Sequence, residues 1–257
     1  MSKAIFITVR TASSRLPKKA LIKINGLATI EYLMQRTKFS KKADKIIVCT
    51  TTLESDDEIC KLAEKNGINF FRGSVKDKLD RCLNAALHYD IKYFINVDGD
   101  DLFCEPELID LALNQYELEQ HDFIKSNEEE LICGAFTFGI KTTALKEICK
   151  IKNTDDTEAA WLLLSENSSI ETSILKKIPE VYYRPEIRAT LDYQEDLEFF
   201  KTIINNFHNE GRDKFTLRDV VAFIDSNPDV LLINKHKHKD YLENQKRLTK
   251  EYRSTNA

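Results

Sequence analysis

The chain of 257 residues contains little glycine and little proline, with 7 and 5 residues. Average proteins contain about 7% glycine and about 5% proline, so this composition excludes collagen, low-complexity disorder and flexible multidomain strings. No apolar run approaches the roughly 20 residues of a membrane span. The segment of residues 1–15 is too short, and beyond Val9 too polar, for a secretory signal. We therefore expect a cytoplasmic globular protein without a membrane partner.

An excess of positive charge is also missing, because 42 acidic residues outnumber 38 lysines and arginines for a formal net charge of −4. A dedicated nucleic-acid-binding protein usually has a strongly basic face, so no nucleic-acid partner is expected. The six cysteines include no C-x-x-C pair, and most follow apolar segments. This pattern predicts buried, reduced thiols in place of a disulfide framework or a zinc site.

Short apolar segments alternate with amphipathic segments through the first half of the chain. The predicted strands are residues 4–9, 45–49, 68–71 and 93–97, and the predicted helices are residues 29–36, 56–66, 77–88 and 106–118. This alternation predicts an α/β fold with a mostly parallel sheet between helices. Ligands bind at the carboxyl ends of such strands. The polar loops after Val9, Cys49, Phe71 and Val97 are therefore expected to line one site.

The second half of the chain is less regular. A strand is predicted at 135–140, an extended segment at 182–191, and helices at 143–150, 154–165, 195–206 and 217–227. Residues 235–257 are almost wholly polar and are expected to form a solvated helix or a frayed tail. The predicted organisation is one domain over residues 1–234, followed by this tail.

A cationic loop follows the first predicted strand. Within ten residues it holds Arg10, Arg15, Lys18 and Lys19. Guanidinium and ammonium groups, together with hydroxyls and backbone amides, are the groups that bind a polyphosphate. The loop has neither the Walker pattern nor the dinucleotide pattern G-x-G-x-x-G. It therefore predicts a phosphate site without a glycine-rich cradle, and the alternative is a solvated basic loop.

The spacing R-x-x-S-x-R-L-P-x-K in this loop resembles the phosphate-binding loop of the acylneuraminate cytidylyltransferase family, which includes the CMP-sialate and CMP-Kdo synthetases. Three further segments resemble that family in the same order. They are R-G-S-x-x-D-x-L-D-R at 72–81, the D-G-D turn at 98–100, and T-L-D-Y-Q-E-D-L-E at 190–198. The resemblance is strongest to the spore-coat polysaccharide cytidylyltransferase-like branch, and it extends over residues 4 to about 234.

The resemblance implies a Rossmann-like nucleotidyltransferase fold, similar to GT-A glycosyltransferases, with a small acceptor-binding and dimerisation elaboration at about 134–186. It also implies a homodimer. The implied reaction transfers CMP from CTP to an acidic sugar or a related small anionic acceptor and releases pyrophosphate. Such a reaction would supply a precursor for a surface polysaccharide.

The resemblance also implies roles for individual residues. Lys19, Arg15 and Asp100 would be catalytic, because phosphoryl-type transfer depends on positioning and on charge neutralisation. Asp100 and Asp192 would be the ligands of Mg²⁺, which prefers carboxylate oxygens and would make the acceptor more nucleophilic. The implied nucleotide-binding residues are Arg10, Ser13, Ser14, Arg15, Lys19, Arg72, Ser74 and Asp98.

Two pairs of residues have more specific predicted roles. Arg72 and Ser74 are candidates for recognising the cytosine edge, where a site built for the amino group would reject UTP. Arg184 and Arg188 lie in the predicted extended segment and are candidates for binding a carboxylate or phosphate of the acceptor. The alternative for these two arginines is an ordinary place on the surface.

The sequence departs from the family pattern at Thr11-Ala12, where a glycine is common, at Asp98 and Asp101 around the acidic turn, and at Tyr193-Gln194. Alanine tolerates a positive φ poorly, so the first loop is expected to be reshaped. The acceptor stays open among an ulosonic or nonulosonic acid, an alditol phosphate and a phosphonate.

Two other classes of function stay open. The segment at 98–100 is also the D-x-D motif of metal-dependent GT-A glycosyltransferases, which makes a glycosyltransferase the second hypothesis. A non-catalytic nucleotide-binding protein that keeps the fold is the third.

Overall fold

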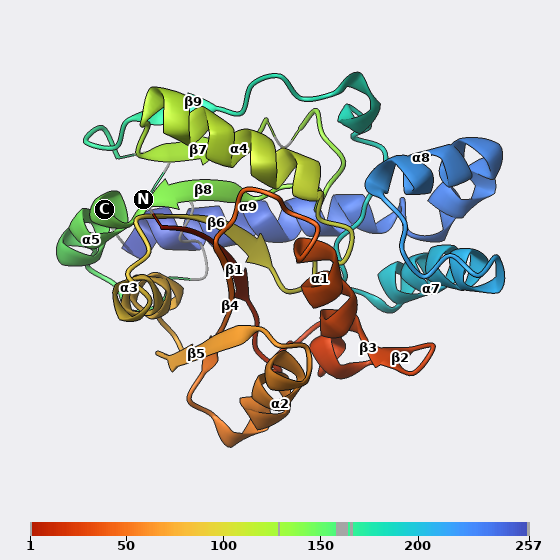
Figure 1. Ribbon diagram of the computed structural model, residues 1–257, viewed down its shortest axis with the longest axis horizontal. Helices are drawn as coiled ribbons and strands as arrows, with labels where there is room; N and C mark the ends of the chain where they lie inside the picture. Colours follow the sequence, from red (N-terminus) through yellow and green to blue (C-terminus); the bar gives the residue numbers. More distant parts are fainter. Residues whose placement is uncertain (1, 128, 158–163, 165–166, 256–257) are drawn as a thin grey trace.

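The computed structural model describes residues 2–127, 129–157, 164 and 167–255, and its centre is a seven-stranded sheet of strand order β5-β4-β1-β6-β8-β7-β9 (Figure 1). The strands are β1 (Lys3–Thr8), β4 (Lys45–Thr51), β5 (Asn69–Gly73), β6 (Tyr93–Asp98), β7 (Phe123–Lys125), β8 (Phe138–Lys141) and β9 (Thr172–Ile174). β5, β4, β1 and β6 are parallel neighbours, β8 runs antiparallel to β6 and β7, and β9 is parallel to β7. The predicted α/β fold with a mostly parallel sheet is confirmed.

Helices cover both faces of this sheet. One face packs against α1 (Thr29–Thr37), α2 (Asp57–Lys65) and α4 (Pro106–Glu119), and the other against α3 (Lys78–His88) and α5 (Thr142–Ile151). Alternate residues of β1 serve the two faces, since Ile5 and Ile7 belong to one apolar cluster while Ala4 and Phe6 belong to the other. Burial on both faces explains why the strand reads as a continuous apolar run.

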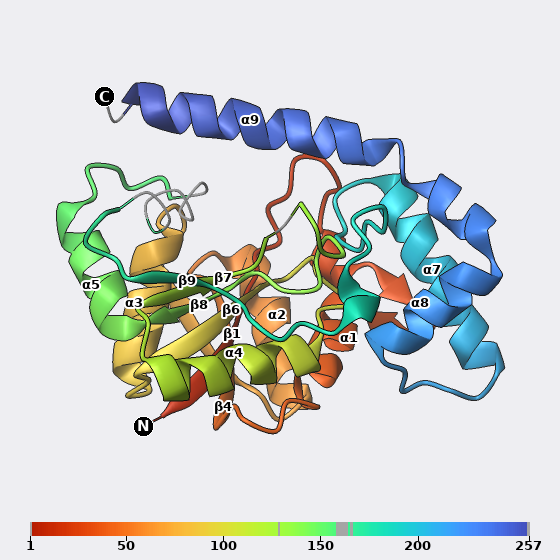
Figure 2. The ribbon, with the colours of Figure 1, turned by 90° about the horizontal axis from the view of Figure 1, so that it is seen from above.

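The remaining elements surround one end of the sheet. A short hairpin joins β2 (Lys23–Ile24) to β3 (Leu27–Ala28), and α7 (Gln194–Asn209) and α8 (Leu217–Ser226) lie together beside α1 (Figure 2). The 3₁₀ turns are η1 (Lys19–Leu21), η2 (Glu54–Asp56), η3 (Glu180–Tyr182) and η4 (Pro228–Ile233). The helices predicted at 195–206 and 217–227 are confirmed as α7 and α8.

Part of the second half differs from the prediction. The segment 182–191, expected to be extended, leaves η3 and turns at Pro185, where the amide of Ile187 donates to the carbonyl of Arg184 at 3.0 Å. Its strand-like contact is a single bridge between Arg188 and Cys133. The strands β2, β3, β7 and β9 were not predicted, because two or three residues are too few to show a period.

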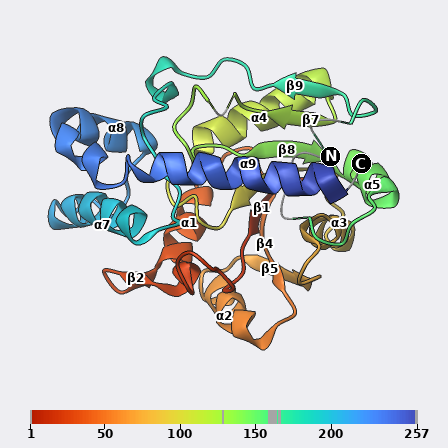
Figure 3. The same ribbon diagram turned by 180° about the vertical axis from the view of Figure 1, so that it is seen from behind.

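Two further predictions have different outcomes. Most of the helix predicted at 154–165 lies outside the described residues. Within the polar segment 235–257, Lys237–Thr255 form the helix α9, which runs across the top of the molecule in Figure 2 and lies in front of the sheet in Figure 3. In the described part of the chain, no helix combines the length and the apolar character needed to cross a membrane. The division into a domain and a tail, with an elaboration at 134–186, stays a prediction.

Candidate active site

A cavity of about 1050 Å³ lies at the carboxyl edge of the parallel strands. It is bordered by residues that directly follow β1 and β6, by the start of α3, by the segments 126–138 and 185–192, and by α9. Of the four loops predicted to meet here, those after Val9 and Val97 line the cavity, and the loop after Phe71 does so through Val75. The loop after Cys49 is not among the described lining residues.

The loop after β1 forms one wall of the cavity. Its lining residues include all five that the sequence assigned to phosphate binding: Arg10, Ser13, Ser14, Arg15 and Lys19. Asp56, which is fully buried, anchors this loop by accepting hydrogen bonds from the Thr11 amide at 2.8 Å and the Thr11 hydroxyl at 2.6 Å. Burial alone would raise the pKa of Asp56, but its hydrogen bonds with Thr11, Thr51 and Thr50 lower it. The loop is therefore held by a charged carboxylate.

Two backbone positions shape this wall without a glycine-rich cradle. The left-handed residue of the loop is Lys18, with φ of 53°, and Ala12 is not among the described residues with positive φ. Gly99 lies beside the loop at the end of β6, where a Cβ atom would come within 2.6 Å of Cβ of Val9. The loop therefore takes its shape without a left-handed conformation at Ala12. The absence of a side chain at Gly99 allows the acidic turn to approach β1.

The acidic turn after β6 supplies the second wall. Asp98 accepts hydrogen bonds from the Thr8 hydroxyl at 2.9 Å and the Asn96 amide at 3.1 Å, and it pairs with Lys78 at 2.5 Å. Burial opposes ionisation of Asp98, but Lys78 lowers its pKa. Burial and the carboxylates of its neighbours instead raise the pKa of Asp101 well above its usual range.

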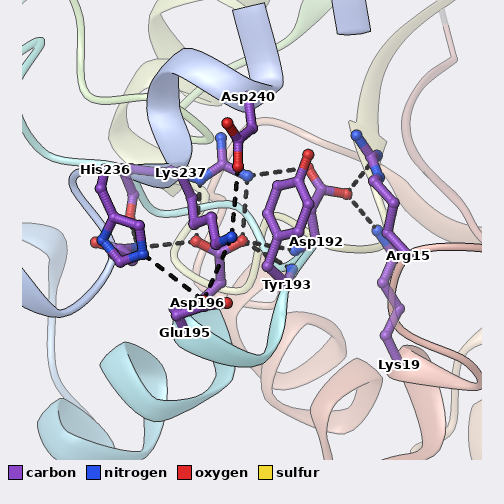
Figure 4. Close-up of polar contacts among 11 residues, drawn as sticks. Arg15, Lys19, Asp192, Tyr193, Glu195, Asp196, His236, Lys237 and Asp240 are labelled. Atoms are coloured by element: carbon purple, nitrogen blue, oxygen red, sulfur yellow. Dashed lines mark hydrogen bonds and ion pairs between the residues drawn. The ribbon is translucent and has the colours of Figure 1, made fainter.

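Lys19 joins the cationic loop to two carboxylates that are far apart in the sequence. Its Nζ atom lies 2.5 Å from Asp100. The same atom lies 2.9 Å from Asp192, and Nη2 of Arg15 lies 2.6 Å from Asp192 (Figure 4). Burial would lower the pKa of Lys19, but the two carboxylates raise it, so the ammonium is charged. Burial opposes ionisation of Asp192 as well, but Lys19 and Arg15 lower its pKa.

This arrangement fits a divalent cation. Asp100 and Asp192 both contact the ammonium group of Lys19, so their carboxylates lie close enough together to share one positively charged partner. A metal ion could occupy the place of this ammonium group. Among the described residues there is no group of three or more His, Cys, Asp or Glu side chains that could hold a metal. Mg²⁺ typically takes one or two carboxylates and completes its shell with water and substrate phosphates, so a two-carboxylate site suits it.

Arg188 does not lie where the sequence predicted. Its side chain is 1% exposed and pairs with Asp192 at 3.0 Å and with Asp196 at 2.9 Å, beneath the cavity wall. Asp196 also accepts hydrogen bonds from the amides of Asp192 and Tyr193, at 2.9 and 3.0 Å. A guanidinium fixed between two buried carboxylates is placed to orient Asp192, and it does not border the cavity in the described lining.

Arg184 also lies outside the described lining of the cavity. Its guanidinium pairs with Glu186, and with Asp225 at 2.8 Å. Its predicted role in binding the acceptor stays a prediction without support from its position.

The two candidates for cytosine recognition are likewise engaged elsewhere. Arg72 donates to the Thr51 carbonyl at 3.0 Å and pairs with Asp57 at 2.7 Å, and the Ser74 hydroxyl accepts from the Asp77 amide at 3.1 Å. Neither residue is among those that line the cavity. Their role with the base stays a prediction, and the residues of this segment that do border the cavity are Val75, Lys76, Lys78 and Arg81.

Two parts of the site were missed from the sequence. Lys78 is the first residue of α3 and follows β5, so the rule that sites form at carboxyl ends of strands could have identified it. No sequence signal indicated that the polar α9 would border the cavity.

The fold and this wall of cations facing carboxylates define a nucleotidyltransferase site, and comparison with known proteins agrees. The cytidylyltransferase family model matches residues 4–254, so the chain belongs to this family. It is 32% identical over 242 residues to the uncharacterized protein MJ1063 of Methanocaldococcus jannaschii, covering 92% of this chain and 96% of that protein.

Two further similarities concern a sequence relative and the fold. The chain is 26% identical over 231 residues to the spore coat polysaccharide biosynthesis protein SpsF of Bacillus subtilis, covering 87% of this chain and 94% of SpsF. The solved structure of a cytidylyltransferase from Leptospira borgpetersenii superposes with a TM-score of 0.80 at 24% identity, covering 90% of this chain and 97% of that one. The family resemblance predicted from the sequence is confirmed, and so is the Rossmann-like nucleotidyltransferase fold.

Proposed function

We propose that the protein transfers CMP from CTP to a small anionic acceptor and releases pyrophosphate, with Mg²⁺ as its cofactor. One observation carries this proposal: Lys19, at the end of the cationic loop, contacts both Asp100 and Asp192 through its Nζ atom. Membership of the cytidylyltransferase family supports CTP as the donor. Similarity to SpsF supports a step in polysaccharide synthesis. The protein is proposed to act as a cytoplasmic homodimer, as the family resemblance of its sequence implies.

The residues of the cavity suit each part of this reaction. CTP is strongly anionic, and Arg10, Arg15 and Lys19 would bind its phosphates and stabilise the leaving pyrophosphate. Asp100 and Asp192 would hold Mg²⁺, which when bound neutralises phosphate charge and increases the nucleophilicity of an acceptor hydroxyl.

Lys19 has to exchange partners for this chemistry. In the structure its ammonium neutralises both carboxylates. Contact with a phosphate would draw Lys19 away and free Asp100 and Asp192 for a divalent cation, so phosphate and cation favour each other's binding. CTP should consequently bind more tightly with magnesium than without it.

The acceptor is proposed to be an acidic sugar, with an alditol phosphate or a phosphonate as alternatives. The wall away from the phosphate loop carries neutral hydrogen-bonding groups, from Ser126, Thr137 and Thr190, that suit a polyhydroxylated ligand.

A glycosyltransferase is less well supported by the geometry. In the D-x-D segment, Asp98 is already engaged by Lys78, Thr8 and Asn96, so Asp100 is the aspartate that faces Lys19. The cationic loop is also unnecessary for transfer from a nucleotide sugar, in which no pyrophosphate leaves.

The first test is a thermal-shift comparison of CTP, UTP, ATP and GTP, each with and without magnesium, followed by an assay of pyrophosphate release with a panel of acidic sugars, alditol phosphates and phosphonates. We expect the largest stabilisation by CTP with magnesium, because a ligand that binds the native state raises the melting temperature. Asp100→Asn should lower kcat/KM at least about 100-fold, whereas Asp90→Asn, at an exposed ion pair with Lys92, should not. Equal activity of Asp100→Asn and wild type, or absence of CTP binding, would contradict the proposal.

A further inference from the structure

The helix α9 forms the roof of the cavity. It follows η4, crosses above the carboxyl edge of the sheet and ends on the side of the molecule where α5 lies (Figures 2 and 3). Six of its described residues border the cavity: His238, Tyr241, Leu242, Asn244, Lys246 and Lys250. The helix therefore contributes chemistry to a site whose other walls come from the sheet.

The start of α9 is fixed beside Arg188 and Asp196. The buried amide of Asn234, just before the helix, donates to the Arg188 carbonyl at 3.0 Å and to the Asp196 carboxylate at 2.9 Å. The guanidinium of Arg188 lies 4.7 Å from the centre of the Tyr241 ring, a cation–π distance. These contacts set the direction in which the rest of the helix crosses the cavity.

Beyond this anchored turn, the roof presents positive charge to the cavity. Lys246 and Lys250 are exposed and lie four residues apart, which places them on one side of the helix. Within the described part of the chain, no carboxylate lies within ion-pair distance of either lysine.

The carboxylates inside the cavity do not compensate this charge. Asp98 is already paired with Lys78, and Asp100 and Asp192 are paired with Lys19. Two further acidic residues border the cavity: Asp101, which accepts a hydrogen bond from the Thr137 hydroxyl at 3.4 Å, and Glu129, which forms no ion pair with Lys246 or Lys250 in the described part of the chain. The nucleotide phosphates are assigned to the loop of residues 10–19, so the roof lysines are left for a different anion.

We propose that Lys246 and Lys250 bind the carboxylate or phosphate group of the acceptor and so determine its class. This inference rests on the proposed function, since it needs a second, anionic substrate beside CTP. It assigns acceptor recognition to the roof, in place of the arginines that the sequence indicated.

The test uses the full chain saturated with CTP and magnesium, and two probes that carry the two anionic groups, acetate and inorganic phosphate. Each probe is titrated at constant ionic strength, and binding is followed by the shift in melting temperature. We expect one probe to stabilise the wild type and its affinity to fall at least about 10-fold in Lys246→Gln/Lys250→Gln. The matched control is Lys239→Gln, on the same helix but outside the described lining and close to Glu243.

Three outcomes would overturn this assignment. In the first, neither probe stabilises the wild type. In the second, a probe stabilises the wild type and the double variant equally. In the third, the double variant loses affinity for CTP at least as strongly as it loses affinity for the probe, which would assign the lysines to the nucleotide. Failure of CTP with magnesium to bind the wild type would instead contradict the proposed function. Once an acceptor is known, the double variant should have a higher KM for this acceptor than the wild type has, whereas its KM for CTP should stay within about twofold of the wild-type value.

Discussion

Two ion-pair clusters meet at Asp192 and differ in what surrounds them. On the cavity side, Lys19 and Arg15 contact Asp192 with side chains that are 15% and 32% exposed. Beneath it, Arg188 and Asp196 are 1% and 0% exposed. A partly exposed cation can exchange its partner for a ligand, whereas a buried one cannot leave without stranding a charge. We therefore propose that the same residue types serve ligand binding in one cluster and architecture in the other.

The largest effect is expected from breaking the buried cluster. Arg188→Met should lower the free energy of unfolding by about 3–5 kcal/mol, because it leaves Asp192 and Asp196 buried without their cation. Urea denaturation measures this loss. Arg188→Lys keeps the charge but loses the planar guanidinium, so its free energy of unfolding should lie between those of the wild type and Arg188→Met. A loss below about 1 kcal/mol in Arg188→Met would show that the buried cluster is not a structural element.

The cavity-side cluster should respond in the opposite way. Lys19→Ala should lower kcat/KM for pyrophosphate release at least about 100-fold, because it removes a charge that stabilises the transition state. Its loss of stability should be smaller than that of Arg188→Met, since Lys19 borders the cavity. The control is Lys23→Ala, an exposed lysine of β2. Equal destabilisation by Lys19→Ala and Arg188→Met would remove the distinction between the clusters.

The cavity-side cluster was predictable from the sequence, and the buried cluster was not. Arg15, Lys19 and Asp100 follow strands whose apolar runs are visible, and parallel strands bring their carboxyl ends together. Arginine is usually exposed, and the burial of Arg188 depends on partners such as Asn234, which only the folded chain brings to it.

The same limit explains the missed role of α9. Its polar sequence predicts solvation, and that prediction holds for its outer side chains. Its path across the cavity is set by contacts of Asn234 and Tyr241 with Arg188, which no periodicity reveals. The turn around Pro185 was also missed, although a proline between the charged residues Arg184 and Glu186 is a turn signal.

Another buried charge sharpens the comparison, because Asp56 is held by neutral donors. Burial alone would raise its pKa, but its hydrogen bonds with Thr11, Thr51 and Thr50 lower it. A lowered pKa in the folded state stabilises the fold above the unfolded pKa of about 4, and this contribution is lost as the pH falls through the folded pKa. Asp56→Asn should therefore cost about 1–3 kcal/mol at neutral pH.

The pH dependence of the free energy of unfolding separates the effect of the charge of Asp56 from the effect of its hydrogen-bond geometry. Urea denaturation between pH 7 and pH 3 should show the stabilities of Asp56→Asn and the wild type converging as the acid is protonated. The control is Asp57→Asn, whose carboxylate is partly exposed and pairs with Arg72. Parallel curves for wild type and Asp56→Asn would indicate that the lost hydrogen-bond geometry, not the charge, accounts for the cost.

The smallest effect is expected at Arg184, which precedes Arg188 by four residues and was an equal candidate for acceptor binding. Its partners Glu186 and Asp225 are 37% and 54% exposed, and exposed ion pairs contribute about 0–1 kcal/mol. Arg184→Ala should therefore change the free energy of unfolding by less than about 1 kcal/mol and leave the KM for the acceptor unchanged. Urea denaturation and steady-state kinetics test both expectations. A raised KM for the acceptor would indicate that Arg184 takes part in acceptor binding and would weaken the assignment of that role to Lys246 and Lys250.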